Sequence, residues 1–194
     1  ISHEEEAHIM GHLAVTDIHA WRITRFCFLT GCRASEAFGL TWQDIDFSRS
    51  ILVFPETKNH DSRSIPLTKP LLELLGSMKQ GLPGTRIFTK EDGSAYYQAP
   101  RTFRTAVKAL NLNDGHSKRD QLVFHSIRHT VATRLAQRLG PRDLMDVMGW
   151  RTVQMAMRYV HANQDAKMKA LSMLGATQAD NVLPFTRTAE NLDV

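Results

Sequence analysis

The stretch His125–His161 reads HSIRHTVATRLAQRLGPRDLMDVMGWRTVQMAMRYVH, and the rest of the chain is organised around it. His125 and Arg128 stand about one helical turn apart at its start. An apolar stripe at helical spacing follows, which predicts a helix; it consists of Ile127, Val131, Leu135 and Leu139. We expect Gly140 to end this helix, because Pro141 suits the first position of the next one.

Length and composition indicate a globular chain. The 194 residues suffice for one substantial domain, and 42% hydrophobic with 23% charged residues is ordinary for such a domain. A net charge of +4 and a pI of about 9.3 fit a nucleic-acid partner, and fit equally a solvated basic surface. No apolar run approaches the length of a membrane span and no signal peptide opens the chain, so we expect a cytosolic protein with no membrane partner. The chain begins with Ile1, which suggests a fragment of a longer protein.

Cysteine and histidine spacing gives little sign of a metal site. Cys27 and Cys32 do not form a C-x-x-C pair, and we expect them to be reduced and structural. His8 and His12 are four residues apart, a spacing that could ligate a metal, but no third ligand is evident. We therefore expect surface histidines, and predict neither a metal nor a cofactor.

Helical signals dominate most of the chain. Ser2 and Glu5 form a capping-box pattern that predicts a helix over about 3–13. Asp17 can cap a second helix, which Gly31 should end. Further helices are expected over residues 68–78, 99–110 and 165–174.

One hairpin interrupts the helices. The apolar run 51–54 predicts a strand, and residues 64–67 are its expected partner. The loop between them is rich in turn-forming residues and carries Lys58. The predicted fold class is therefore α+β, mainly helical with a small antiparallel sheet.

Two groups of charged residues have open interpretations. Arg33 follows a glycine break at the start of a short helix, and Glu36 lies three residues on, either as a surface ion pair or as a group that holds Arg33 in place. Three basic residues also share one side of the expected 99–110 helix: Arg101, Arg104 and Lys108. That side could contact DNA phosphates or could be the solvated side of an amphipathic helix.

Taken together, four motifs make the chain resemble the catalytic domain of the tyrosine recombinases, the phage-integrase family of site-specific DNA recombinases. The motifs are TGCRASE around Arg33, TKNHDSRSIPL around Lys58, HSIRHTVAT around His125 and Arg128, and MGWRTVQMAMRYVH around Trp150 and Tyr159. The resemblance covers about residues 1–175. The family more often has histidine at the place of Trp150, and both rings offer an N–H donor.

The resemblance implies cleavage of DNA without a metal. Tyr159 would attack the scissile phosphate and form a 3′-phosphotyrosyl bond, which a 5′-hydroxyl later attacks to reseal the strand. Arg33 and Arg128 would clamp the phosphate oxygens, because a guanidinium binds two oxygens and keeps its charge. Lys58 would protonate the leaving 5′-oxygen.

The remaining roles follow from the same resemblance. His125 would accept the proton of Tyr159 or form a hydrogen bond with it, and Trp150 would donate its indole N–H to the phosphate and pack against the tyrosine helix. Glu36 would orient Arg33. We expect His129 to face another side of its helix and to be structural.

The family also implies an organisation and partners. We expect a catalytic domain over 1–175, a tail over 176–194 that docks on a neighbouring protomer, and upstream core-binding and arm-binding domains that the chain lacks. The expected partner is double-stranded DNA, bound by a homotetramer with possible accessory DNA-bending proteins. The task would be integration or excision of a phage or mobile element, in a bacterial cell or phage-infected host, with chromosome-dimer resolution as a further possibility.

Two other functions compete with this interpretation. A type IB topoisomerase would use the same chemistry to relax supercoils. A DNA-binding module without catalysis would use Tyr159 only as a core aromatic residue.

Overall fold

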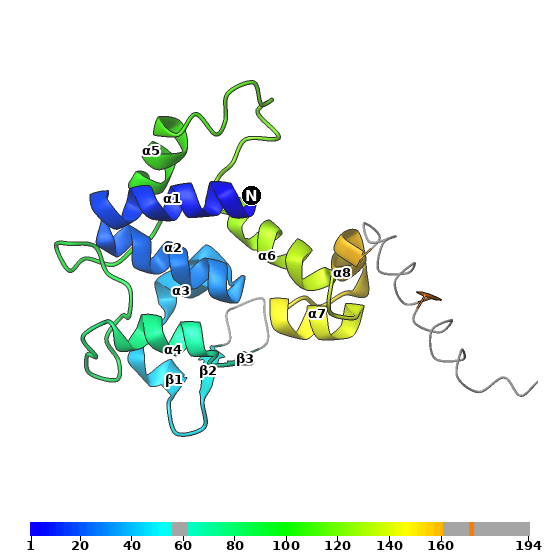
Figure 1. Ribbon diagram of the computed structural model, residues 1–194. Helices are drawn as coiled ribbons and strands as arrows, with labels where there is room; N and C mark the ends of the chain where they lie inside the picture. The colour runs from blue at the N-terminus through cyan, green and yellow to red at the C-terminus, as the bar shows by residue number, and fades with distance from the viewer. Residues whose placement is uncertain (56–61, 161–170, 173–194) are drawn as a thin grey trace, which may run out of the picture. The chain divides into compact units, whose positions relative to one another are not determined.

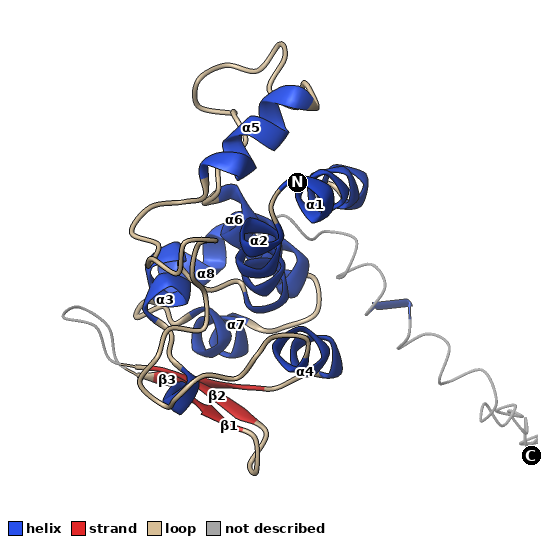
Figure 2. Ribbon diagram, turned by 90° about the vertical axis from the view of Figure 1, so that its left-hand side faces the viewer, coloured by secondary structure: helices blue, strands red, loops and turns tan. Residues whose placement is uncertain are grey.

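The computed structural model describes residues 1–55, 62–160 and 171–172, and Ile1–Val160 form one compact unit. A small sheet lies at one end of this unit, and the helices lie to one side of it (Figures 1 and 2). The helices are α1 (His3–Thr16), α2 (Ile18–Thr30), α3 (Ala34–Gly39), α4 (Lys69–Gly76), α5 (Arg101–Ala109), α6 (Ser126–Ala136), α7 (Pro141–Met148) and α8 (Val153–Val160), with a 3-10 turn at Trp42–Asp44. The strands are β1 (Ile45–Asp46), β2 (Ile51–Phe54) and β3 (Arg63–Pro66). The predicted fold class, mainly α with a small antiparallel sheet, is confirmed.

Some expectations fall on other residues. Lys58 and nearly all of the expected 165–174 helix lie outside the described residues, as does the tail after residue 175. Within the described ranges, no helix is long and apolar enough to cross a membrane.

Local capping sets the first two helices as predicted. The Ser2 hydroxyl accepts a hydrogen bond from the Glu5 backbone N–H at 3.1 Å, and the Glu5 carboxylate accepts from the Ser2 N–H at 2.6 Å. The helix continues to Thr16, beyond the predicted end at 13. Asp17 caps α2 through the Ala20 N–H at 2.9 Å, and α2 ends at Gly31, whose φ of 62° is left-handed.

The predicted hairpin is present, with its second strand shifted by one residue. In the described residues the sheet has the antiparallel order β1-β2-β3, and Phe54 pairs with Arg63. Leu52 and Phe54 are buried while Val53 between them is exposed, which is the alternation of a sheet with one face on the core. The short strand β1 was not predicted.

The prediction that Gly140 ends the helix after His125 is wrong. That helix, α6, ends at Ala136, and the turn that follows is closed by hydrogen bonds from Arg138 and Leu139 to the Leu135 carbonyl. Gly140 has a φ of −66° and precedes α7, with Pro141 at the first position as expected. Gly140 lacks the left-handed conformation of a C-terminal cap, because it opens the next helix instead.

The core has two parts. The larger joins α1, α2, the sheet, α4 and α5, with Ile23, Phe26 and Leu52 fully buried. The smaller lies between α6, α7 and α8, and its buried members are Ala132, Ala136, Leu144, Met148 and Ala156. Small residues on α6 and α8 let these helices approach closely, which places the side chains of His129 and Tyr159 within reach of each other.

Candidate active site

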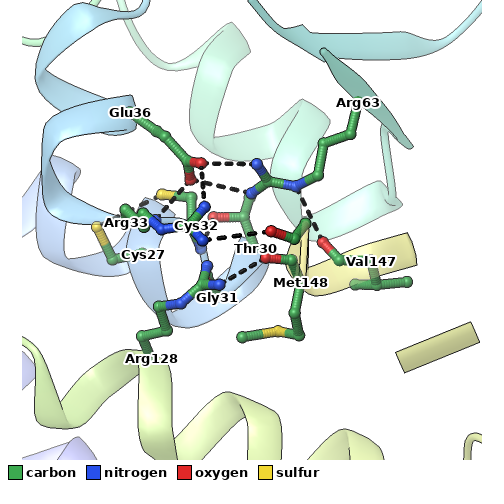
Figure 3. A network of polar contacts seen from close by, with 11 residues as sticks. Cys27, Thr30, Gly31, Cys32, Arg33, Glu36, Arg63, Arg128, Val147 and Met148 are labelled. Atoms are coloured by element: carbon green, nitrogen blue, oxygen red, sulfur yellow. Dashed lines mark hydrogen bonds and ion pairs between the residues drawn. The ribbon is translucent and has the colours of Figure 1, made fainter. Parts of the chain in front are cut away.

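Segments far apart in sequence meet in one polar network (Figure 3). The α2–α3 turn supplies Arg33, strand β3 supplies Arg63, α6 supplies Arg128, and the end of α7 supplies backbone carbonyls. The turn after α7 and helix α8 add aromatic rings beside it. Four of the predicted site residues, Arg33, Glu36, Arg128 and Trp150, therefore belong to one neighbourhood.

Glu36 holds Arg33 at the start of α3. One carboxylate oxygen lies 2.9 Å from Arg33 Nη1, and the other accepts the Arg33 backbone N–H at 2.7 Å. The side chain of Glu36 is 6% exposed and that of Arg33 is 23% exposed. The pair is thus no solvated surface contact, and the alternative in which Glu36 positions Arg33 is supported.

Arg128 is buried against two carbonyls. Its Nη1 donates to the Gly31 oxygen at 2.8 Å, and its Nη2 donates to the Met148 oxygen at 2.5 Å. Arg33 Nη2 donates to the next carbonyl, that of Gly149, at 3.2 Å. Consecutive carbonyls therefore hold the two guanidinium groups side by side. That these groups clamp a phosphate stays a prediction.

Burial and charge act on Arg128 together. Burial lowers its pKa, the nearby Arg33 lowers it further, and the value is about 10. Arg128 therefore remains a cation at neutral pH. The Glu36 carboxylate opposes this lowering of the pKa, but Arg33, Arg63 and Arg128 outnumber it, so the cluster keeps a net positive charge that suits an anion such as a phosphate.

Arg63 is a site residue that the sequence analysis missed. Its Nη1 and Nη2 hold the Glu36 carboxylate at 2.7 and 3.0 Å, and its Nε donates to the Val147 carbonyl at 3.1 Å. Its guanidinium carbon lies 4.1 Å from the centre of the Phe54 ring. The available signal was an arginine at the end of the hairpin loop, five residues after Lys58 in the TKNHDSRSIPL motif.

The Glu36 carboxylate is kept ionised by these partners. Burial acts to raise its pKa, but hydrogen bonds and charge from Arg63, followed by those of Arg33, outweigh burial and lower the pKa to about 2. Glu36 is therefore an ionised carboxylate that contacts both Arg33 and Arg63.

Gly149 allows the close approach of Arg63. Its φ of 62° is left-handed, and a Cβ built there would lie 2.9 Å from the Cδ of Arg63 and 3.0 Å from its Nη1. Only glycine fits this position without displacing Arg63.

Tyr159 lies on the aromatic side of the network. Its ring stacks on Trp150 with 5.1 Å between centroids and 13° between planes, and the Arg128 guanidinium carbon lies 5.7 Å from the Trp150 ring centre. The expected packing of Trp150 against the tyrosine helix is confirmed. Burial raises the pKa of Tyr159, while the charges of Arg128 and Arg158 partly oppose this rise.

The expectation that His129 faces elsewhere is wrong. Its Nδ1 lies 2.5 Å from the Tyr159 hydroxyl oxygen. Its ring also makes an edge-to-face contact with the His125 ring, with 4.8 Å between the ring centroids. Residues four apart share a helix face, so His129 lies on the same side of α6 as His125. The tyrosine hydroxyl therefore bonds to His129, whereas His125 was the expected partner.

His125 lies in the field of both arginines. Burial lowers its pKa, and the charges of His129, Arg128 and Arg33 lower it further. His125 is thus a neutral member of the cluster near pH 7.

The other predicted residues remain less defined. Arg101, Arg104 and Lys108 are exposed on α5, which packs on α1 and α2, so both interpretations of this basic face stay open. Across the described ranges, no group of three or more His, Cys, Asp or Glu side chains is arranged to hold a metal ion.

The sequence as a whole matches a known family. The model of the phage integrase family covers residues 1–166 of this chain. The chain belongs to the phage integrase family. Among curated relatives of this integrase-family chain, a probable integrase/recombinase of Methanocaldococcus jannaschii is 28% identical over 152 residues, which are 75% of this chain and 46% of that protein. The shufflon-specific DNA recombinase of Escherichia coli is 26% identical over 164 residues, 83% of this chain and 39% of that protein. The chain therefore spans less than half the length of these relatives.

Solved structures of integrases share the fold. The Tn1549 transposon integrase, solved with circular intermediate DNA, has a TM-score of 0.71 at 22% identity, with 90% of this chain and 66% of that chain covered. The catalytic domain of bacteriophage HP1 integrase has a TM-score of 0.66 at 24% identity, with 93% of this chain and 98% of that domain covered. The integrase-family chain thus has the fold of an integrase catalytic domain.

Proposed function

We propose that this chain is the catalytic part of a site-specific DNA recombinase, which cleaves and rejoins strands through a 3′-phosphotyrosyl bond during integration or excision of a phage or mobile element. One observation carries the proposal. Arg33 and Arg128 are held side by side on the Gly149 and Met148 carbonyls, and Trp150 links Arg128 to Tyr159 by stacking. Membership of the phage integrase family supports the same activity.

The chemistry suits a phosphodiester. The Tyr159 oxygen attacks phosphorus, the bond from phosphorus to the 5′-oxygen breaks, and negative charge grows on the non-bridging oxygens. Arg128 has five N–H donors, of which two are used by the Gly31 and Met148 carbonyls, so donors remain that a phosphate oxygen can accept from. Loss of one such set of donors commonly costs on the order of 3 kcal/mol of transition-state stabilisation.

The leaving 5′-oxygen needs a proton, and we assign its delivery to Lys58. Its loop joins Phe54 to Arg63, the strand residue that is anchored in the arginine network. A substrate with sulfur at the 5′-bridging position tests the assignment, because a thiolate leaves without a proton. That substrate should restore cleavage to Lys58→Ala, and a variant that stays inactive on it would contradict the general-acid role.

Covalent capture tests the function itself. A pool of duplexes with randomised sequence and a nick allows the cleaved strand to diffuse away, so an active protein becomes trapped on its target. Denaturing gels should show adducts for the parent protein and for Tyr97→Phe, a control at an exposed tyrosine, and none for Tyr159→Phe. Adducts formed by Tyr159→Phe would show that another residue is the nucleophile.

The wider assembly is part of the proposal. The double-stranded DNA substrate places the protein in the cytoplasm of a bacterial cell or a phage-infected host. Residues 1–175 form the catalytic domain, residues 176–194 dock on a neighbouring protomer, and core-binding and arm-binding domains belong to the whole protein. A homotetramer then assembles on DNA, with accessory DNA-bending proteins where the site requires them.

A further inference from the structure

Helices α6 and α8 bring a second histidine to the proposed nucleophile. His129 Nδ1 lies 2.5 Å from the Tyr159 hydroxyl, and the two rings are nearly parallel, with 6.0 Å between centroids and 28° between planes. Ala132 on α6 and Ala156 on α8 are fully buried in the small core that these helices share, and their small side chains allow the helices to pack closely beside this contact. The pairing is therefore built into the packing of α6 on α8.

A tyrosine nucleophile needs a group that takes its proton. The Tyr159 side chain is half-buried, and burial raises its pKa because it disfavours the charged phenolate. A proton acceptor within hydrogen-bond reach would therefore assist the attack. Glu36 is already bound by Arg33 and Arg63. In the described part of the chain, the hydrogen bond made by the Tyr159 hydroxyl goes to His129.

We propose that His129 is a catalytic residue whose Nδ1 accepts the Tyr159 hydroxyl proton as the phenol oxygen attacks phosphorus. The inference rests on the proposed role of Tyr159 as nucleophile. In the cleavage step the O–H bond breaks, an N–H bond forms on Nδ1, and the oxygen–phosphorus bond forms while the 5′-oxygen leaves with a proton from its own acid. In the resealing step the 5′-hydroxyl attacks phosphorus and returns its proton to the acid that supplied it, while the bond from phosphorus to Tyr159 breaks and the tyrosine oxygen recovers its proton from His129.

The surrounding charges fit a transfer that occurs only with DNA in place. Arg128 on α6, Arg158 on α8 and Arg33 on the α2–α3 turn place positive charge around this cluster, while His125 beside it is neutral. The three arginines stabilise a phenolate and disfavour an imidazolium. A bound phosphate adds negative charge, which stabilises the imidazolium and so favours the transfer when substrate is present.

The tautomer of His129 gives a test that needs no DNA. An acceptor Nδ1 requires the neutral ring to carry its proton on Nε2. Nitrogen-15 NMR of the labelled protein should show His129 in this tautomer, with an Nδ1 shift that changes in Tyr159→Phe. A proton on Nδ1 in the neutral ring would overturn the proposal, because the histidine would then donate to the tyrosine.

Substitutions separate proton acceptance from positioning. Asparagine places an oxygen near the position of Nδ1 and can accept the hydrogen bond, but it does not take the proton. On the duplex recovered from the randomised pool, His129→Asn and His129→Ala should form adducts at least about 100-fold more slowly than the parent. The exposed His116→Asn is the matched control and should keep the parent rate.

Two further readouts exclude a purely structural effect. The rate of adduct formation in the parent should fall at acid pH, where a base is protonated, and this fall should disappear in His129→Asn. A fluorinated tyrosine at position 159, which ionises more readily, should accelerate His129→Ala by a larger factor than it accelerates the parent. A parent-like rate in His129→Asn, or a slow variant with the fall at acid pH intact and no gain from fluorination, would overturn the proposal. Either result would leave Tyr159 as nucleophile if Tyr159→Phe stays inactive.

Discussion

Arg63 holds both carboxylate oxygens of Glu36, at 2.7 and 3.0 Å, from a strand that begins 27 residues later in the chain. Glu36 in turn holds Arg33, so the hairpin and the proposed phosphate clamp are mechanically connected. The side chains of Arg63 and Glu36 are 10% and 6% exposed. The pair is therefore largely shielded from solvent screening, and each partner depends strongly on the other.

Removal of Arg63 should destabilise the protein. In Arg63→Ala the Glu36 carboxylate stays buried with one of its two arginines missing, and we expect a loss of about 3–5 kcal/mol in the free energy of unfolding. Arg63→Lys keeps the charge but cannot make the two-pronged contact, so its loss should be smaller. Urea denaturation measures both, with the exposed Arg142→Ala as a control. A loss in Arg63→Ala no larger than in the control would contradict the importance of the pair.

Glu36 should make stability depend on acid pH. Its pKa of about 2 in the folded protein lies below its ordinary value of 4.5, so its contribution is complete above pH 4.5 and is lost as pH falls towards 2. The shift corresponds to about 3 kcal/mol. Thermal unfolding of the parent and of Glu36→Gln across this range should show the parent losing its advantage on acidification. If the stability of the parent and of Glu36→Gln fell equally with decreasing pH, the prediction would be wrong.

Gly149→Ala should disturb Arg63 through the backbone. The left-handed φ of 62° and the contact of 2.9 Å with Arg63 Cδ both oppose a side chain. We expect a loss of about 1–2 kcal/mol in stability from the backbone conformation alone, together with slower adduct formation. Gly84→Ala is the control, since a Cβ there meets nothing within 4 Å. Equal stability of the two variants would show that Gly149 tolerates a side chain.

Trp150 combines a stacking surface with an N–H donor, and two substitutions separate them. Trp150→Phe keeps a ring against Tyr159 but removes the donor, whereas Trp150→Ala removes both. If the indole N–H binds the phosphate, Trp150→Phe should slow adduct formation by roughly 10-fold, in line with about 1.5 kcal/mol for one hydrogen bond to a charged group. Trp150→Ala should be slower still. Parent-like kinetics in Trp150→Phe would limit Trp150 to packing.

The basic face of α5 makes a prediction about salt. If Arg104 and Lys108 contact phosphates, Arg104→Gln and Lys108→Gln should each reduce the slope of log affinity against log salt concentration by about 0.9. The exposed Lys79→Gln provides the control. Fluorescence anisotropy with duplex DNA at several salt concentrations measures the slopes. Unchanged slopes would assign this face to solvent.

The sequence indicated the members of the candidate site better than their contacts. The clamp of Arg33 and Arg128 was expected only from the family resemblance that all four motifs carry together, and the structure places both guanidinium groups on neighbouring carbonyls. Arg63 was missed because its importance comes from a contact with Glu36, 27 residues away in the chain, and local sequence patterns do not reveal such a contact. The role of Lys58 stays a prediction, since it lies outside the described residues.

What the sequence by itself determined was local. Ser2, Asp17, Gly31 and Pro141 set helix starts and ends through contacts within about four residues, so their effect can be inferred from spacing. Only the tertiary structure decided which histidine meets Tyr159, because that contact spans 30 residues. His125 and His129 lie about one turn apart on one face of α6, and the position at which α8 packs along α6 decides which of them meets Tyr159, a choice that helical spacing alone does not make.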